Sequence, residues 1–371
     1  MMSPKESPKI SVIVPAFNVS ESVFEECCRS ISEQTETSYE VIVVDDASTA
    51  SAAEAIEEIC SRYGFQLLKN TSNLGVSQTR NRAIEIARGD YLTFIDSDDC
   101  VYPDFFEETL ELIERTGADC VIGELEFTAP DVYLPSRATE AIDYGLFDGS
   151  RLTYVMKGTL AGRDFMPKDV RINHSFVHAG PCGRIYRKTA LGDVSFDTSL
   201  AIGEDIKFNL DFLAQARACV LVRKTWYQYK QHTASATNNL TREGINAQIR
   251  LCSYLCGSDV IAAYRLKQEA YGRILASLKV IIGKGVTRLQ IGYFDKRKEV
   301  KRLLELASFA EALSSIRLAY FDLSPKDRLF VGLARRRCCG LLLLIFSANA
   351  FVEGLRNALL ALRRPSYGFG R

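Results

Sequence analysis

Several features that mark common classes of protein are absent from this 371-residue chain. Its eleven cysteines include no C-x-x-C pair, and the adjacent pairs at 27–28 and 338–339 suit neither a normal disulfide nor a zinc site. The first ten residues, MMSPKESPKI, have no apolar core of the kind found in secretory signals. We therefore expect a cytoplasmic protein whose cysteines are reduced thiols, most of them small core residues.

The chain also has no net charge, with 46 Lys or Arg and 46 Asp or Glu, but the two signs are unevenly distributed. Residues 271–371 hold 19 Lys or Arg against 7 Asp or Glu, so the first 270 residues carry the compensating negative balance. Hydrophobic residues make up 47% of the chain, which indicates a globular protein with a sizeable core. The basic region has no nucleic-acid recognition motif, so no nucleic-acid partner is expected.

What the sequence does contain is an alternation of strand and helix patterns over its first 125 residues. Helices are predicted at 21–33, 51–63, 75–88 and 102–117, and strands at KISVIVPAF, YEVIVVDDAS, FQLLKN, YLTFIDSDD and ADCVIGEL. Because these strands are apolar on both faces, they predict an α/β fold with a mainly parallel sheet flanked by helices. From about residue 243 the pattern is almost entirely helical, so we expect two domains, 1–240 and 241–371.

Carboxylates follow two of these strands directly. Asp45 and Asp46 end one strand, and Asp96, Asp98 and Asp99 end another. Ligands of such sheets bind beyond the carboxyl ends of the strands, so both clusters are expected to meet in one crevice. Carboxylates set this closely suit Mg²⁺ or Mn²⁺ shared with substrate phosphates. The alternative is that this loop only caps the following helix, a role open to Asp99.

Four segments in this order resemble the family 2 glycosyltransferases: ISVIVPAFN, VIVVDDAST, NLGVSQTRNRAIEIARGDYLTFIDSDD and GEDIKFNLDFL. The resemblance covers about residues 8 to 235. It implies a GT-A fold, which is Rossmann-like, and inverting transfer of a sugar from a nucleotide-sugar donor, most often a UDP-sugar. Thr79 stands where the family usually has Ala, a small departure from its pattern.

The resemblance also implies a set of residues that bind the donor nucleotide. They are Pro15, Phe17, Asn18, Asp46, Asn73, Arg80 and Asp96. Asp46 matches the residue that accepts a hydrogen bond from the base, whereas Asp45 is expected to stabilise a loop or helix end. Arg80 either touches the nucleotide or only pairs with an aspartate of the cluster.

Metal, diphosphate and catalytic roles follow from the same resemblance. Asp98 is the expected metal ligand, with Asp99 and His232 as further ligands and Mn²⁺ or Mg²⁺ as the cofactor. Lys230, Ser235 and Arg184 are expected near the diphosphate. Asp205 is the expected base, supported by Glu204, because an inverting transfer needs one group that takes the acceptor proton. The alternative is that GEDIKF is simply an acidic helix start.

These observations favour one of three functions. We expect a hexosyl- or N-acetylhexosaminyltransferase that acts on a glycan or lipid-linked glycan in cell-surface polysaccharide synthesis. A sugar nucleotidyltransferase is disfavoured because VPAFNVSES is not a Gly-rich phosphate loop, and the missing G-x-G-x-x-G also argues against a dehydrogenase. A catalytically inactive nucleotide-sugar-binding scaffold remains the alternative from another class.

The helical region ends in an apolar stretch after three arginines, RRRCCGLLLLIFSANAFV at 335–352. It is short for a membrane span, which needs roughly 20 apolar residues. Two interpretations stay open: a buried helix of the C-terminal domain, or a helix in the interface of an anionic membrane at its cytoplasmic face. The basic balance of this region favours peripheral membrane contact.

Overall fold

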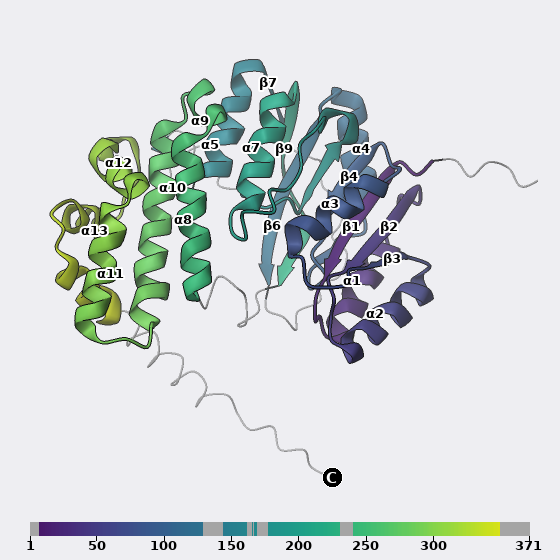
Figure 1. Cartoon of the computed structure of the whole chain (residues 1–371). Coiled ribbons are helices and arrows are strands. Elements are labelled where there is room, and N and C mark those ends of the chain that lie inside the picture. The colour runs from purple at the N-terminus through teal and green to yellow at the C-terminus, as the bar shows by residue number, and fades with distance from the viewer. Residues whose placement is uncertain are drawn as a thin grey trace, which may run out of the picture. The chain divides into compact units, whose positions relative to one another are not determined.

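The computed structural model describes residues 7–128, 144–161, 165, 167–168, 177–230 and 240–348 (Figure 1). The chain divides into two compact units. The first comprises residues 1–161, 168–235 and 262–265, and the second comprises 162–167, 236–261 and 266–371. The expected domain ranges, 1–240 and 241–371, stay a prediction.

The described part of the first unit contains a nine-stranded mixed sheet. Its strands are β1 (Ile10–Ala16), β2 (Tyr39–Asp45), β3 (Gln66–Lys69), β4 (Tyr91–Phe94), β5 (Cys100–Val101), β6 (Cys120–Thr128), β7 (Tyr144–Asp148), β8 (Arg184–Arg187) and β9 (Ala218–Lys230). The order is β3-β2-β1-β4-β8-β6-β9-β5, with β7 also paired to β9. The first four strands are parallel, as predicted, whereas β8 is antiparallel to both of its neighbours.

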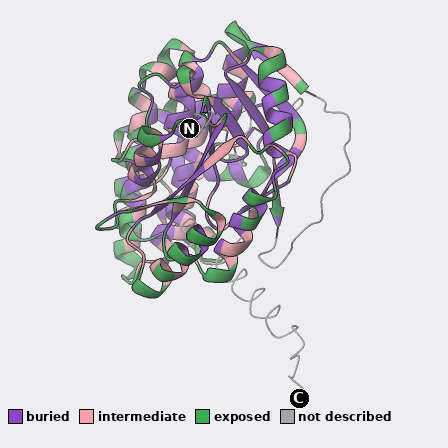
Figure 2. Ribbon diagram, turned by 90° about the vertical axis from the view of Figure 1, so that its right-hand side faces the viewer, coloured by how far each residue is buried: buried purple, intermediate pink, exposed green. Residues whose placement is uncertain are grey.

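Helices cover both faces of this sheet, so its centre is buried (Figure 2). The helices of the first unit are α1 (Glu21–Ser32), α2 (Ala50–Tyr63), α3 (Val76–Ile86), α4 (Phe105–Thr116), α5 (Leu152–Leu160) and α7 (Glu204–Gln215). Apolar residues of α1, α2 and α4 form one core cluster with alternate residues of β1 and β2. Phe208 of α7 packs against Phe94 of β4 at 5.7 Å between ring centroids. Helices α2 and α4 end at left-handed glycines, Gly64 and Gly117, the usual helix stop.

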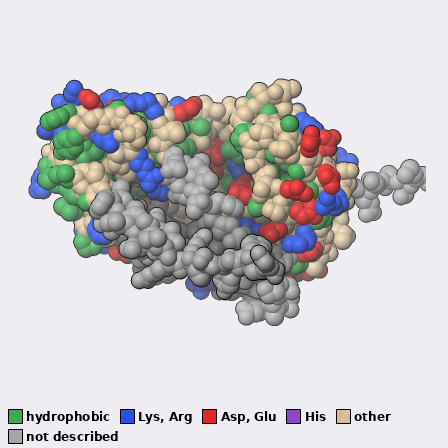
Figure 3. All heavy atoms as spheres, turned by 90° about the horizontal axis from the view of Figure 1, so that it is seen from below, with side chains coloured by type: hydrophobic (Ala, Val, Ile, Leu, Met, Phe, Trp, Pro, Cys, Tyr) green, Lys and Arg blue, Asp and Glu red, His purple; other side chains and the backbone are tan. Residues whose placement is uncertain are grey.

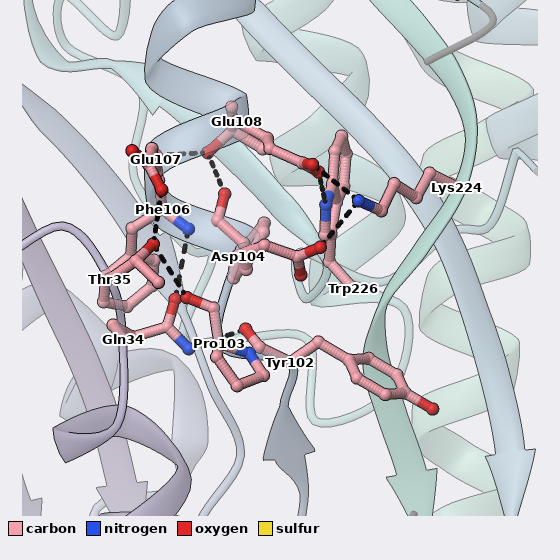
Figure 4. Close-up of polar contacts among 12 residues, drawn as sticks. Gln34, Thr35, Tyr102, Pro103, Asp104, Phe106, Glu107, Glu108, Lys224 and Trp226 are labelled. Carbon is pink, nitrogen blue, oxygen red and sulfur yellow. Dashed lines mark hydrogen bonds and ion pairs between the residues drawn. The ribbon is translucent and has the colours of Figure 1, made fainter. Parts of the chain in front are cut away.

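A polar cluster fixes β9 against α4 (Figure 4). Lys224 donates to Asp104 and Glu108, at 2.6 Å each, and Trp226 Nε1 donates to Glu108 at 2.7 Å. The Trp226 ring also lies over the backbone of Gly123 on β6, where a Cβ atom would come within 2.5 Å of the ring. These contacts hold the carboxyl-terminal half of β9 in one register, which matters because that half reaches the acidic loop.

The rest of the described chain is helical. Its helices are α8 (Arg242–Gly257), α9 (Asp259–Ala263), α10 (Lys267–Val280), α11 (Tyr293–Glu305), α12 (Ala307–Ser315) and α13 (Pro325–Arg335), and a short π-helix spans Ile281–Gly285. Residues 339–348 form a further helical segment. Within the described residues, no helix is long and apolar enough to cross a membrane.

All eleven cysteines lie in the described residues and are free thiols, nine of them buried. The prediction of core thiols without a disulfide framework is confirmed. Burial raises the pKa of the Cys27 and Cys182 thiols well above the ordinary value, so these groups stay protonated at neutral pH.

Candidate active site

Arg80 of α3 joins two acidic segments that lie more than 100 residues apart in the sequence. Its side chain is only 5% exposed, and Nη2 lies 2.7 Å from Asp96 Oδ1 while Nη1 lies 3.7 Å from Glu204 Oε1. The guanidinium also sits over the ring of Phe196, 5.2 Å from its centroid. Arg80 therefore supplies a positive charge that the acidic strand end needs, and it brings that strand end together with the start of α7.

Phe196 is itself held by the residue after Arg80. Asn81 Nδ2 donates to Phe196 O and Phe196 N donates to Asn81 Oδ1, both at 2.8 Å. This reciprocal pair fixes the loop that carries the ring against α3. Sequence reasoning missed Phe196, because nothing in SFDTSL indicates a partner 115 residues earlier.

Asp99 is the most deeply buried carboxylate of the acidic loop. Tyr227 Oη donates to its Oδ2 at 2.7 Å, and the backbone N of Lys230 donates to its Oδ1 at 2.8 Å. Tyr227 Oη also accepts from Asp96 N at 3.0 Å. Burial, followed by the charges of Asp96 and Asp98, raises the pKa of Asp99 to about 8. Strand β9 thus organises the loop through Tyr227, a residue that the sequence analysis did not single out.

The fit of a divalent cation to this loop depends mainly on Asp98. Among the described residues, no group of three or more His, Cys, Asp or Glu side chains is arranged to hold a metal ion. A cation that shares its coordination with substrate phosphates needs only one or two protein carboxylates. Asp98 is partly exposed, whereas Asp99 is buried. A role for Asp98 in holding Mg²⁺ or Mn²⁺ beside a substrate diphosphate stays a prediction.

Asp46 anchors the loop that leads into α3. Its Oδ1 accepts from Asn70 Nδ2 at 2.6 Å and from Leu74 N at 2.8 Å, and its Oδ2 accepts from Gly75 N at 2.8 Å. Asp45 accepts from Ser48 N at 3.1 Å, which is the loop-stabilising role expected for it. Contact between Asp46 and a nucleotide base stays a prediction, and in this structure its carboxylate already shapes the surrounding loop.

Two apolar side chains are exposed beside this loop. Phe17, after β1, is 50% exposed and Leu74, before α3, is 48% exposed. Asn18, which has a left-handed φ of 49°, ties the loops after β1 and β2 together: its N donates to Ser48 Oγ and its Oδ1 accepts from Thr49 N, both at 2.8 Å. The expected donor residues Pro15, Phe17 and Asn18 therefore lie on one side of the acidic loop, with Asn73 exposed in the loop that Asp46 holds.

Glu204 and Asp205 form the first turn of α7, after Gly203 in a left-handed conformation with φ of 84°. Burial, followed by repulsion from Asp205, raises the pKa of Glu204 to about 7. The helix-start interpretation of GEDIKF is thus correct as far as secondary structure goes. It does not exclude a catalytic role, because Arg80 links Glu204 to the acidic loop.

The remaining predicted site residues either contact other partners or lie outside the described residues. Lys230 Nζ pairs with Glu26 of α1, so a phosphate contact would require this ion pair to break. Arg184 is buried in β8 and donates to Asn209 Oδ1 at 3.1 Å and to the carbonyl of His178. His232 and Ser235 lie outside the described residues.

Comparison with known proteins matches residues 11–194 to the family described as Glycosyl transferase family 2. The chain is 27% identical to the uncharacterized glycosyltransferase YibD of Escherichia coli over 64% of its length and 65% of that protein. It is 25% identical to the putative glycosyltransferase EpsH of Bacillus subtilis over 85% of its length and 89% of that protein.

Among solved structures, residues 1–349 of S. aureus TarS in complex with UDP are 19% identical to this chain. The match covers 93% of this chain and 92% of that one, with a TM-score of 0.58. A structure of the same fragment in complex with UDP-GlcNAc is 17% identical, with the same TM-score. At this level of identity the likeness establishes the fold, a GT-A-type α/β sheet with a helical C-terminal region.

Proposed function

The chain contains a family 2 glycosyltransferase domain, and from this premise we propose that it is a metal-dependent inverting enzyme that uses a UDP-sugar. The donor sugar would be a hexose or N-acetylhexosamine, and the acceptor a hydroxyl of a glycan or lipid-linked glycan in cell-surface polysaccharide synthesis. The UDP and UDP-GlcNAc complexes of TarS, which shares the fold, support the choice of UDP.

One observation carries this proposal: Arg80 connects the acidic loop after β4 with the two carboxylates that start α7. A transferase must hold the diphosphate beside the acidic loop and place a base within reach of the same anomeric carbon. Because Arg80 contacts both segments from a buried position, it keeps them at a fixed separation. A binding scaffold would have no need of that second acidic segment.

The residues of the chain would act in a single displacement. Asp46 and Phe17 would orient the base, and Asp96 the ribose or a bound water. Asp205, which is partly exposed beside Glu204, would take the proton of the acceptor hydroxyl as that oxygen attacks the anomeric carbon. The bond from this carbon to the diphosphate oxygen breaks on the opposite face, so the product has the inverted configuration. Asp98, with Asp99 as a further ligand, would hold a divalent cation, which would neutralise charge on the leaving diphosphate.

Release of UDP from a panel of UDP-sugars, measured for the full chain and for Asp205→Asn, tests this assignment. We expect the variant to lose at least 100-fold in rate while its UDP affinity stays within about threefold of the unsubstituted chain. Asp211→Asn, on the same helix and paired with Lys207, serves as the matched control and should retain activity. An unchanged rate for Asp205→Asn would disprove the base assignment, and no turnover of any UDP-sugar by a chain that binds UDP would favour the inactive scaffold.

The location of the enzyme is a second part of the proposal, and it begins with helix 339–348. Leu342 and Leu343 are buried, which agrees with the core-helix interpretation. Leu341, Leu344 and Ile345 are exposed at i, i+3 and i+4, so one apolar face of the same helix is open. The buried face of this helix therefore agrees with packing in the C-terminal domain, and the exposed face is available for contact with a membrane surface.

Further apolar and basic side chains lie around that open face. Phe294 at the start of α11 is 73% exposed, and the hydroxyl of its neighbour Tyr293 lies close to Gly340. Residues 293–305 and 335–337 together hold eight Lys or Arg against three Asp or Glu. Figure 3 shows apolar side chains with Lys and Arg around them on the second unit. We propose that this surface rests on an anionic membrane, because apolar insertion and phosphate attraction act together there.

Flotation with vesicles of phosphatidylglycerol and phosphatidylcholine tests the membrane contact. Phe294→Ser combined with Leu344→Ser should reduce the floated fraction at least fivefold, and 0.5 M NaCl should also reduce it. Ile86→Ser on α3 removes an apolar residue that is 38% exposed from the first unit and serves as the control. Equal flotation of all three proteins would exclude this surface as the membrane contact, as would no flotation of the unsubstituted chain.

A further inference from the structure

The ring of Phe196 connects Arg80 with helix α7. The guanidinium carbon of Arg80 lies 5.2 Å from the centroid of this ring. Phe208 of α7 stacks on the same ring, with 4.0 Å between the centroids and 2° between the ring planes. Phe208 follows Glu204 by four positions, so both side chains lie on one face of α7. Arg80 therefore reaches α7 by two routes, one through Glu204 and one through the stacked rings.

The direct contact between Arg80 and Glu204 is too long to fix α7 by itself. The 3.7 Å between Arg80 Nη1 and Glu204 Oε1 exceeds the length of a hydrogen bond. Among the described residues, the buried Nε of Arg80 has no hydrogen-bond partner. The flat face of the Phe196 ring restricts the tilt of the guanidinium that these contacts leave free. The position of α7 relative to Arg80 therefore depends on Phe196.

Phe94, the last residue of β4, packs against both Phe196 and Phe208. The ring centroids are 5.3 Å and 5.7 Å away and the planes are at 83° and 85°, which is the edge-to-face arrangement that aromatic rings favour. All three rings are less than 2% exposed. Because Asp96 lies two positions after Phe94, this aromatic cluster joins the same two segments as the ion pairs of Arg80, namely the acidic loop and the start of α7.

Phe196 lies in the loop between β8 and α7, where Asn81 of α3 holds its backbone. The Asn81 side chain and the Phe196 backbone exchange two hydrogen bonds of 2.8 Å. Asn81 follows Arg80 directly, so one turn of α3 carries both the charge and the anchor of the ring. A substitution that shortens the side chain of Phe196 leaves these backbone hydrogen bonds in place and removes the flat surface that faces Arg80.

We propose that Phe196 is a positioning residue that acts through Arg80: its ring fixes the guanidinium and thereby the first turn of α7 relative to the acidic loop. The inference rests on the proposed transferase function, and it names a residue on which the rate of that transfer depends. Phe196 takes no part in the chemical step. A shift of a reacting group by about 1 Å can lower a rate roughly 100-fold, so even a small displacement of α7 has a measurable effect.

Steady-state kinetics of Phe196→Leu test the proposal, with release of UDP from a UDP-sugar as the readout. Leu keeps an apolar side chain at this position but offers no flat surface to Arg80. We expect kcat to fall at least about tenfold while KM for the UDP-sugar stays within about threefold, since the displaced carboxylates of α7 act on the acceptor. Phe24→Leu on α1 makes the same substitution at a position that is also fully buried, and it should keep kcat within about twofold.

A combination with Arg80→Lys tests whether Phe196 acts through Arg80. Lys keeps the charge but has no planar group that could lie on the ring. In this background we expect Phe196→Leu to lower the rate no more than about threefold further, so that the two effects are far from additive. Full additivity would exclude the proposal, as would an unchanged kcat in Phe196→Leu or an equal loss in Phe24→Leu. If Phe196→Leu fails to fold, Phe196→Met replaces it in every measurement, because Met adapts to irregular space in a core.

NMR of the guanidinium groups tests the positioning of Arg80 without any substrate. In a chain that contains nitrogen-labelled arginine, the Arg80 signals are those that disappear in Arg80→Lys. A guanidinium held in place gives separate signals for its two Nη groups, because rotation about the Cζ–Nε bond is slow. We expect separate signals in the unsubstituted chain and in Phe24→Leu, and one averaged signal in Phe196→Leu.

The two experiments separate the levels of the proposal. Separate Nη signals in Phe196→Leu would exclude a positioning role for the ring, whatever the kinetics show. If the signals merge as expected but no UDP-sugar is turned over by the unsubstituted chain, the transferase proposal fails, while the contact by which Phe196 holds Arg80 is confirmed.

Discussion

Replacing Glu204 by Gln should stabilise the protein at neutral and alkaline pH while impairing catalysis. The side chain of Glu204 is only 13% exposed, and the folded state raises its pKa from 4.5 to about 7. Burial and the neighbouring Asp205 both disfavour the ionised form, and Arg80 offsets only part of this cost. Gln has nearly the same shape and no charge, so it imitates the protonated carboxyl at every pH.

The sign and size of the effect follow from linkage. A carboxyl whose pKa is higher in the folded state favours folding below its unfolded value, and this contribution is lost as the pH rises through the folded value. With 4.5 unfolded and about 7 folded, the difference between Glu204→Gln and the unsubstituted chain grows from under about 1 kcal/mol at pH 5 to about 3 kcal/mol at pH 8. At roughly 2–4 °C per kcal/mol, the melting temperature of the variant should be higher by roughly 6–12 °C at pH 8.

Differential scanning fluorimetry of both proteins from pH 5 to pH 9 measures this difference. Asp211→Asn, on the same helix, provides the control for loss of a carboxylate from α7. Transfer activity of Glu204→Gln should fall, because the acceptor-side carboxylates lose one charge near Asp205. If the melting-temperature difference is constant over this pH range, burial and Asp205 do not disfavour the ionised form of Glu204, and this account is refuted.

Three further substitutions test the packing around the site. Arg80→Met should destabilise the fold by about 3 kcal/mol in urea titrations. This value is at the low end for a broken buried ion pair because Asp96 is partly exposed. A loss of stability under about 1 kcal/mol would contradict the bridging role of Arg80. Asp46→Asn should lower the free energy of unfolding by about 2–3 kcal/mol, since the Asn side chain cannot accept from all three groups that donate to Asp46. It should also weaken UDP binding at least tenfold by calorimetry. Gly123→Ala should cost about 1–3 kcal/mol by urea titration, because its Cβ would meet the Trp226 ring at 2.5 Å; unchanged stability would show that the ring moves freely.

The parts of the fold that could be predicted are those in which local pattern and burial agree. The runs that became β1 and β2 are apolar on both faces, and helix α2, which follows β2, ends at Gly64. Strand β8, Arg184–Arg187, was not predicted, since its four residues RIYR carry no apolar alternation. Its antiparallel position between β4 and β6 depends on long-range pairing, which periodicity does not report.

The candidate site, like the fold, could be predicted only in part from the sequence. The acidic residues could be selected from the sequence because carboxylates at strand ends are costly without a partner. The partners themselves could not, because Arg80 reaches Glu204 across 124 positions and Tyr227 reaches Asp99 across 128. Side chains that organise a site from a distant strand, such as Tyr227, have no local signature beyond an aromatic residue in a β-rich segment.

Calorimetric titration of the full chain with UDP, GDP and dTDP, with and without Mn²⁺, tests the central claim most directly. The account predicts that UDP binds best, that Mn²⁺ strengthens its binding at least tenfold, and that Asp98→Ala abolishes this gain without unfolding the protein. Binding that is indifferent to Mn²⁺ and to Asp98 would contradict the metal-diphosphate site. Failure of the folded chain to bind any of the three nucleotides would contradict the donor assignment itself.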